Sequence, residues 1–223
     1  MTLVADELEA AACEQTGLRD FGDGYHREGL ERLVSAMNDE ADLIGTGEMM
    51  QRGRLGTHLV ARLHVAATYR EHPEIDEQVV EGPMFVIGLP RTGTTALSQL
   101  VAADPQFRSI RLWEPGSPVP PPEAATHHTD PRIAATEAGL AMMNEAFPLM
   151  QTMYHSEATT ASECQDLMGM SFRTVHMFAL DALLDACPNA RFLWSHRDPA
   201  LVLGSVCSLV HYTRYIEAFD AAL

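Results

Sequence analysis

Hydrophobic residues in the first third of the chain recur at the spacing of an α-helix, with polar residues between them. Two stripes share this spacing: Leu30, Leu33, Val34 and Met37, and then Leu55, Leu59, Val60, Leu63 and Ala67. Such stripes predict amphipathic helices. Glycine-rich breaks at 17–29 and 45–47 are predicted to separate them, and Pro73 to end the last, because proline disfavours helix in the residue before it. The pattern predicts a helical N-terminal segment over residues 1–80.

The period changes after Pro83. Met84–Ile87 is a short continuous apolar run, and a helical pattern at 94–103 follows it after a glycine-containing loop. A second β-rich run at 190–194 is followed by a helical stretch at 200–215. Between these two units the sequence predicts a strand at 107–112, a proline-rich loop at 114–123, and helices at 130–147 and 160–186. Strands that alternate with helices predict an α/β fold with a parallel sheet flanked by helices.

The composition is that of a globular protein, with 46% hydrophobic and 21% charged residues among 223. Thirty-one acidic residues against 15 basic ones give a formal charge of −16, which argues against nucleic acid and anionic lipid as partners. All 15 basic residues are arginine, so a mechanism that needs a lysine is excluded.

The cysteines and the hydrophobic runs bear on metal binding, redox chemistry and cellular location. Four widely spaced cysteines include no C-x-x-C pair, so neither a zinc site nor a redox dithiol is indicated. The N-terminal residues lack a secretory signal, and no uninterrupted apolar run reaches membrane-spanning length. We expect a cytoplasmic protein without stable membrane insertion.

The loop after the first predicted strand, 88–95, has the glycine spacing of a phosphate-binding loop. Backbone N–H groups and a helix N-terminus converge on an anion in such a loop. Nucleoside triphosphatases carry a lysine after the second glycine, whereas this chain has Thr94, which weakens a kinase or NTPase interpretation. The cation of the loop is Arg91, whose guanidinium suits an oxygen on a transferring group. The alternative is that the glycines only turn the chain and the threonines only cap the helix.

This loop contains the run Pro90, Arg91, Thr92, Gly93, Thr94 and Thr95. The run resembles the 5′-phosphosulfate loop of sulfotransferases that use 3′-phosphoadenosine 5′-phosphosulfate (PAPS), in its arginine form. The resemblance implies a P-loop NTPase-like parallel sheet, PAPS as co-substrate and no metal. The family's second motif has an arginine at a strand end and a serine eight residues later, and Arg197 and Ser205 match it. The resemblance assigns these two residues to the nucleotide 3′-phosphate.

The resemblance covers most of the chain and assigns residues 81–223 to a sulfotransferase-like domain. Relative to the family, the chain is expected to be shortened between Phe172 and His176 and after Leu223. The predicted activity is transfer of a sulfuryl group to a hydroxyl or amine of a small-molecule acceptor. A non-catalytic nucleotide-binding member of the fold and a P-loop kinase are the alternatives, and self-association is left open.

The resemblance also indicates catalytic residues. Arg91 would stabilise the departing phosphate, because the negative charge on this leaving group must be neutralised in such transfers. Glu114 is the predicted base, because it follows Arg91 by 23 residues, close to where tyrosylprotein sulfotransferases carry theirs. Histidine is the base in other sulfotransferases, so His127, His128 and His155 are further candidates. A structural role for Glu114, holding the proline-rich loop, is the alternative.

Overall fold

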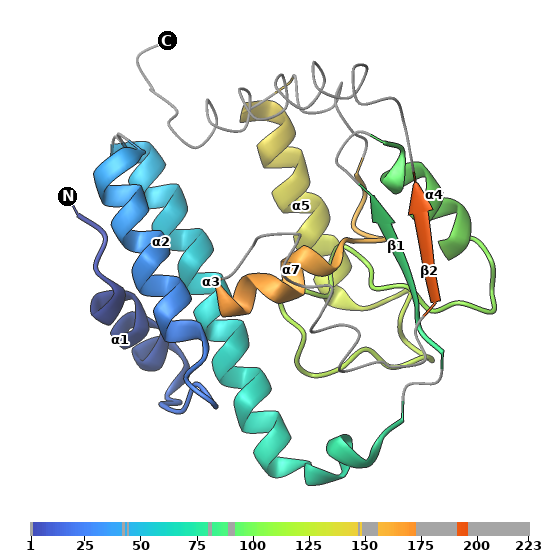
Figure 1. Ribbon diagram of the computed structural model, residues 1–223, viewed down its shortest axis with the longest axis horizontal. Coiled ribbons are helices and arrows are strands. Elements are labelled where there is room, and N and C mark those ends of the chain that lie inside the picture. Colours follow the sequence, from blue (N-terminus) through green and yellow to red (C-terminus); the bar gives the residue numbers. More distant parts are fainter. Residues whose placement is uncertain are drawn as a thin grey trace.

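The computed structural model describes residues 2–41, 43, 45–79, 82–88, 92–146, 148, 156–172 and 191–195. Three helices form one side of the molecule, and two strands with their neighbouring helices form the other (Figure 1). The three N-terminal helices are α1 (Ala5–Thr16), α2 (His26–Glu40) and α3 (Gly45–Glu71). A short 3₁₀ helix, η1 (Pro73–Glu77), follows them. Helix α3 therefore ends before His72 and Pro73, as predicted.

The core of the described chain lies among these three helices. Its most deeply buried large side chains are Leu3, Leu30, Leu59 and Leu63. Leu30 comes from the first predicted stripe and the last two come from the second, so both stripes face the core as predicted. Burial of each such leucine stabilises the fold by about 1.5–3 kcal/mol before entropy is counted.

The predicted glycine breaks are wider than the observed ones. Gly17 ends α1 in a left-handed conformation with φ 72°, which glycine adopts without strain. Gly29 lies inside α2, however, and Gly45 and Gly47 lie inside α3. A glycine inside a helix costs only about 1 kcal/mol relative to alanine, and burial of the apolar stripes on the same helices offsets that cost.

The two predicted strand units are confirmed where the structure describes them. Strand β1 (Met84–Gly88) leads towards helix α4 (Thr94–Ala102), and β2 is Arg191–Ser195. The two strands pair in parallel, with Met84 opposite Arg191 and Gly88 opposite Ser195. Segments more than a hundred residues apart in the sequence thus lie side by side (Figure 1).

The strand predicted at 107–112 does not form. The segment makes one isolated antiparallel bridge, between Arg111 and Ala161, and then turns, because the Glu114 N–H donates to the Arg111 carbonyl. The Arg111 N–H donates to the Glu114 carboxylate at 3.0 Å. The pairing stays a single bridge because both segments turn beside it, the second through a hydrogen bond from the Thr160 N–H to the Glu157 carbonyl.

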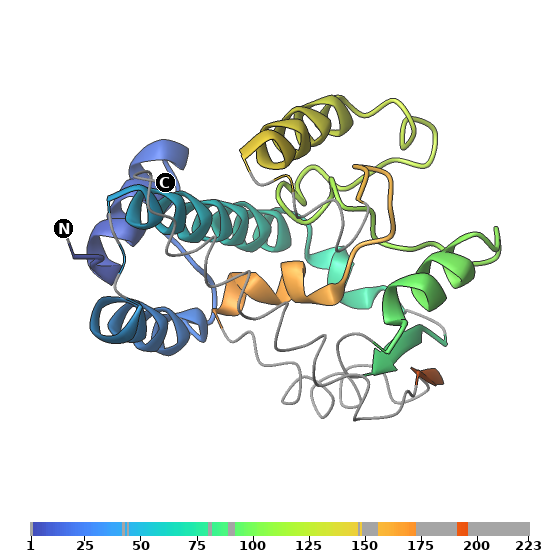
Figure 2. The ribbon, with the colours of Figure 1, turned by 90° about the horizontal axis from the view of Figure 1, so that it is seen from above.

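Helix α5 (Pro131–Ala146) confirms the helix predicted at 130–147. The helix predicted from residue 160 begins later, as α7 (Cys164–Met168), and continues as the 3₁₀ helix η2 (Gly169–Ser171). The rest of that prediction, and the helix predicted at 200–215, lie outside the described residues. In both views α7 lies between the N-terminal helices and the strands (Figure 2).

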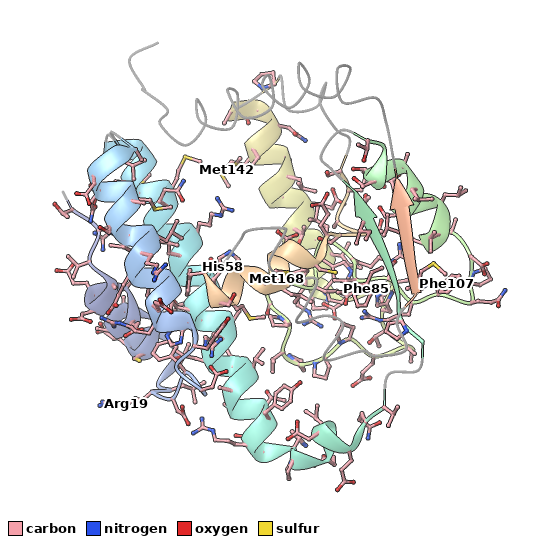
Figure 3. All side chains as sticks on the ribbon, viewed as in Figure 1. Arg19, His58, Phe85, Phe107, Met142 and Met168 are labelled. Carbon is pink, nitrogen blue, oxygen red and sulfur yellow. The ribbon has the colours of Figure 1, made fainter. Side chains whose placement is uncertain are left out.

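Phe172 attaches the end of η2 to the N-terminal helices. Its ring is buried, with its centroid 6.4 Å from the His26 ring on α2 and 6.2 Å from the His58 ring on α3. Its φ is 55°, which is unusual for a bulky residue and requires support from surrounding contacts. Figure 3 shows His58 on α3 near the point where α7 meets it.

Candidate active site

The predicted phosphate loop begins where β1 ends, at Gly88, and finishes at the start of α4. Gly93 is the residue before the helix and has φ 94°, a left-handed conformation that favours glycine. Its carbonyl accepts the first helical hydrogen bond, from Leu97 N at 3.0 Å. Of the predicted loop residues, Thr92, Gly93, Thr94 and Thr95 are described, whereas Pro90 and Arg91 lie outside the described residues.

This conformation suits an anion. The first N–H groups of a helix have no acceptor within the helix, and the helix dipole adds partial positive charge at the same end. Gly93 itself has no side-chain cap, so no side chain from that position competes for these donors. A phosphate or sulfate next to Thr94 could accept hydrogen bonds from the first N–H groups of α4.

The second predicted motif starts on the neighbouring strand. Strand β2 ends at Ser195, which pairs with Gly88 at the end of β1. Because the strands are parallel, the segments that follow β1 and β2 leave the same edge of the pair, where neighbouring strands are about 4.8 Å apart. Arg197 follows two residues after β2, and Arg197 and Ser205 both lie outside the described residues.

Glu114 lies at the centre of a buried polar cluster, with only 5% of the residue exposed. One carboxylate oxygen, Oε2, accepts from Nη2 of Arg108 at 2.5 Å. The other, Oε1, accepts from the Arg111 N–H at 3.0 Å and lies 3.1 Å from Nε2 of His127. The structure therefore places two of the predicted base candidates in contact.

The remaining histidine candidates are placed less centrally. The His128 ring lies edge-on to the His127 ring, with 5.3 Å between centroids, and His128 is exposed. His155 lies outside the described residues. Of the histidine candidates that the structure describes, His127 is thus the one that contacts Glu114.

Trp113 and Arg132 form the support of this cluster. Trp113 is buried, its ring lies 5.5 Å from the His127 ring, and the Arg132 guanidinium lies 4.6 Å from its centroid. Arg132 also donates to the carbonyls of Ser117 and Pro120, at 2.6 and 2.8 Å, and so holds the proline-rich loop. Its hydrogen bonds to Asp130 lower the pKa of that carboxyl to about 2.

The sequence did not predict the roles of Arg108, Trp113 and Arg132. The available signal was local: Arg108 precedes Glu114 by six residues, and Arg132 follows Asp130-Pro131 at a predicted helix start. Neither spacing identifies a partner without the tertiary structure, because arginine side chains reach many surfaces.

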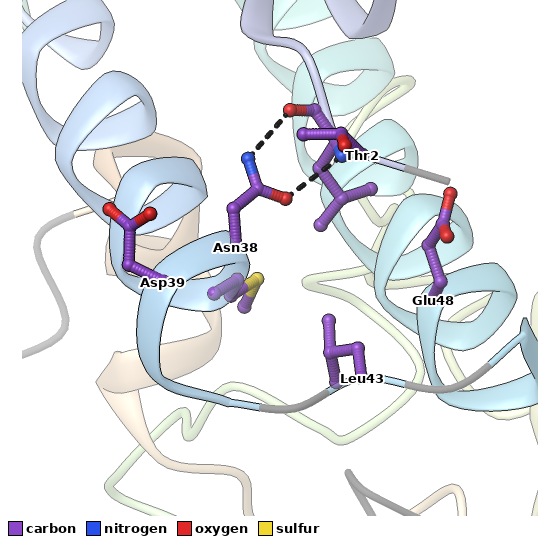
Figure 4. Close-up of a pocket in the computed structure, with 7 residues that line it drawn as sticks. Thr2, Asn38, Asp39, Leu43 and Glu48 are labelled. Carbon is purple, nitrogen blue, oxygen red and sulfur yellow. Dashed lines mark hydrogen bonds between the residues drawn. The ribbon is translucent and has the colours of Figure 1, made fainter.

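A pocket elsewhere in the fold does not suit the predicted co-substrate. A cavity of about 260 Å³ opens among the N-terminal helices (Figure 4), and its lining residues are Thr2, Leu3, Met37, Asn38, Asp39, Leu43 and Glu48. Asn38 bridges the backbone of Leu3, with hydrogen bonds of 3.0 Å to its N–H and 2.9 Å to its carbonyl. The carboxylates of Asp39 and Glu48 would repel a nucleotide phosphate.

A family model described as the sulfotransferase family matches residues 83–221, which include both predicted anion motifs. The chain belongs to the sulfotransferase family. It is therefore a transferase, of a family that typically uses PAPS. No curated protein matches the sequence.

Two solved structures of mycobacterial sulfotransferases resemble this sulfotransferase. STF1 from Mycobacterium tuberculosis H37Rv is 28% identical with a TM-score of 0.82, and the match covers 94% of this chain and 72% of STF1. STF9 from Mycobacterium avium is 26% identical with a TM-score of 0.85, and the match covers 96% of this chain and 67% of STF9. The chain thus has the sulfotransferase fold over nearly its whole length.

The part of the chain that the structure describes holds no group of three or more His, Cys, Asp or Glu side chains that could bind a metal ion. Among the helices described, none is both long enough and apolar enough to span a bilayer.

Proposed function

We propose that this sulfotransferase moves a sulfuryl group from PAPS to a hydroxyl or amine of a small-molecule acceptor. The parallel register of β1 and β2 carries the proposal, because Gly88 and Ser195 lie opposite each other at the ends that lead into the two motifs. One nucleotide with a phosphate at each end could then bridge the two loops. Opposite strand directions would have sent the motifs to opposite edges.

The same interpretation predicts a larger sheet around the two described strands. The strands β1 and β2 would belong to a larger parallel sheet of the P-loop NTPase type, flanked by helices. Residues 81–223 would form the transferase domain after the helical segment 1–80, a division supported by the family match at 83–221.

The loop after β1 would bind the 5′-phosphosulfate. The N–H groups near Gly93, Thr94 and Thr95 and the hydroxyl of Thr92 would bind its oxygens, with Pro90 shaping the turn. Arg91 would neutralise charge on the departing phosphate as the bond from sulfur to the phosphate oxygen breaks. Arg197 and Ser205 would bind the 3′-phosphate, which distinguishes PAPS from ATP.

The acid–base step would belong to Glu114 and His127, which the fold brings to 3.1 Å. The acceptor hydroxyl must lose its proton as its oxygen forms a bond to sulfur. A base within hydrogen-bond reach of that proton contributes about 10²–10⁴-fold to such a step.

Ligand binding can be measured by thermal unfolding with 3′-phosphoadenosine 5′-phosphate, compared with ATP plus Mg²⁺. At a hundredfold excess over Kd a ligand adds about 2.7 kcal/mol, or roughly 5–10 °C for a chain of this size. We expect this shift with the 3′-phosphorylated nucleotide and not with ATP. Arg32→Ala is the matched control for the variant Arg197→Ala described below. It removes an exposed arginine on α2 and should leave the shift unchanged.

A larger shift with ATP would overturn the proposal in favour of a kinase. Arg197→Ala should abolish the preference for the 3′-phosphate, and an unchanged preference would remove Arg197 from the site. Sulfate transfer is then measured from labelled PAPS to a panel of small hydroxyl and amine acceptors. Binding of the nucleotide without transfer to any acceptor would favour a non-catalytic member of the family.

A further inference from the structure

The contact between Glu114 and His127 indicates how the two side chains divide the acid–base work, an inference that rests on the proposed sulfuryl transfer. The Glu114 carboxylate already accepts from Arg108, from the Arg111 N–H and from His127. An ionised carboxylate offers about four lone-pair sites, so three are occupied. Little of Glu114 remains to accept a proton from a substrate.

The same contact determines which nitrogen of His127 carries the proton. An ionised carboxylate only accepts hydrogen bonds, so Nε2, at 3.1 Å from Glu114 Oε1, carries the proton. In the neutral ring Nδ1 then carries the lone pair. A carboxylate that orients an imidazole in this way also stabilises the imidazolium that forms when the ring takes a proton.

Exposure separates the two groups further. The His127 side chain is 17% exposed, and the Glu114 side chain is 7% exposed. Glu114 forms an ion pair with Arg108, whereas the His127 ring packs against Trp113 and His128. The imidazole is therefore the more accessible member of the pair.

We propose that His127 is the base of the sulfuryl transfer and that Glu114 is a positioning residue that acts through it. Nδ1 of His127 would take the proton of the acceptor hydroxyl as the acceptor oxygen bonds to sulfur. The bond between sulfur and the phosphate oxygen breaks in the same step, and its electron pair stays on the nucleotide phosphate. Arg108 would hold Glu114 in place through the ion pair at 2.5 Å.

Several charged groups lie near His127. Glu114 contacts the ring directly, and the Asp130 carboxylate interacts with it electrostatically. The guanidinium of Arg132 lies over Trp113, against which the His127 ring packs, and Arg108 bonds the same Glu114 carboxylate. His128 lies edge-on to the His127 ring.

The decisive experiment is chemical rescue of His127→Ala. We expect kcat to fall by about 10²–10⁴-fold and to recover at least tenfold when imidazole is added. The shift in Tm with 3′-phosphoadenosine 5′-phosphate should stay as in the wild type. An unchanged shift shows that the variant still folds and binds the nucleotide, so that the fall in kcat is not a loss of binding. The matched control is His64→Ala, an exposed histidine on α3, for which imidazole should change nothing.

Glu114→Gln keeps the shape of the side chain and removes its charge. It should lower kcat by at least tenfold with little change in KM. It should also move the acidic limb of the pH–kcat profile to lower pH, because an imidazolium without its carboxylate partner loses its proton more readily. A merely structural Glu114 would leave this limb in place. A wild-type kcat in His127→Ala, or a loss that imidazole does not restore, would overturn the proposal.

A second measurement does not depend on activity or on the folding of a variant. Nitrogen NMR of the wild-type protein at neutral pH distinguishes the two tautomers of His127. We expect the proton on Nε2. A proton on Nδ1 would overturn the proposal, even if the protein binds the nucleotide and transfers sulfate.

Discussion

The guanidinium of Arg132 lies over the ring of Trp113, 4.6 Å from its centroid. Arg132 is in the first turn of α5, and Trp113 precedes Glu114, so this contact joins the helix to the polar cluster. The same guanidinium donates to two carbonyls of the proline-rich loop. A single planar cation thus fixes the segment that carries the base candidates.

Arg132→Lys should therefore destabilise the protein by about 1–3 kcal/mol. A lysine ammonium cannot stack on Trp113 and bond Ser117, Pro120 and Asp130 at the same time. Urea unfolding measures the difference. Arg32→Lys is the control, because Arg32 forms an exposed pair with Glu28 and should change stability by less than about 0.5 kcal/mol. Equal effects of the two substitutions would contradict the role given to Arg132.

Gly169→Ala should destabilise the joint between η2 and α3. A Cβ at this position would lie 2.6 Å from Cε1 of His58, a ring that also contacts Phe172. Overpacking of this kind costs about 1–3 kcal/mol. Removing the obstacle with His58→Ala in the same chain should recover part of the loss, which a double-mutant cycle of unfolding free energies measures.

The control for this cycle is Gly53→Ala on α3. No atom of the residues that the structure describes lies within 4 Å of a Cβ at Gly53, so the change should be neutral or stabilise the helix by up to about 1 kcal/mol. Additive effects of Gly169→Ala and His58→Ala would show that the two positions do not interact.

The same joint should weaken in acid. Burial, above all, lowers the pKa of His26 and of His58 from the ordinary value of 6.5, with Arg62 and Arg54 acting in the same direction and Glu9, Asp23 and Asp166 opposing them. The unfolded chain then binds protons more readily than the folded one below pH 6.5. Stability is therefore complete above that pH and falls as pH decreases towards the lowered values.

Thermal unfolding of the wild type and of His58→Gln checks this prediction between about pH 8 and pH 5. Glutamine does not titrate, so the wild type should lose more stability than the variant as the pH falls. A difference in Tm between the two proteins that stays constant over this range would contradict the assignment.

Gly93→Ala should strain the loop before α4. The residue has φ 94°, and among the described residues nothing lies within 4 Å of a Cβ there, so the penalty is conformational and amounts to about 1–2 kcal/mol. We expect lower stability and a smaller Tm shift with 3′-phosphoadenosine 5′-phosphate, both measured by thermal unfolding. Gly139→Ala on α5 has equal space without the positive φ and should retain the wild-type shift.

The elements that the sequence predicted well are those whose signals are local. The apolar run at 84–87 formed β1, the run at 190–194 formed β2, and the helical pattern after Pro131 formed α5. The strand predicted at 107–112 failed because the chain turns after Arg111 and its bridge partner turns before Ala161, and residue propensities do not contain these contacts. The breaks predicted at Gly29 and Gly47 failed because burial of apolar side chains outweighs the helix propensity of one glycine.

Residue identity and spacing alone define the chemistry that the chain can attempt, through an arginine-bearing anion loop, a matching second motif and the absence of lysine. The positions of Gly88 and Ser195 side by side, and the contact between Glu114 and His127, depend on the folded chain. The physical reason is that local pattern sets the period of each element, whereas the pairing of distant segments depends on packing between surfaces that are far apart along the chain.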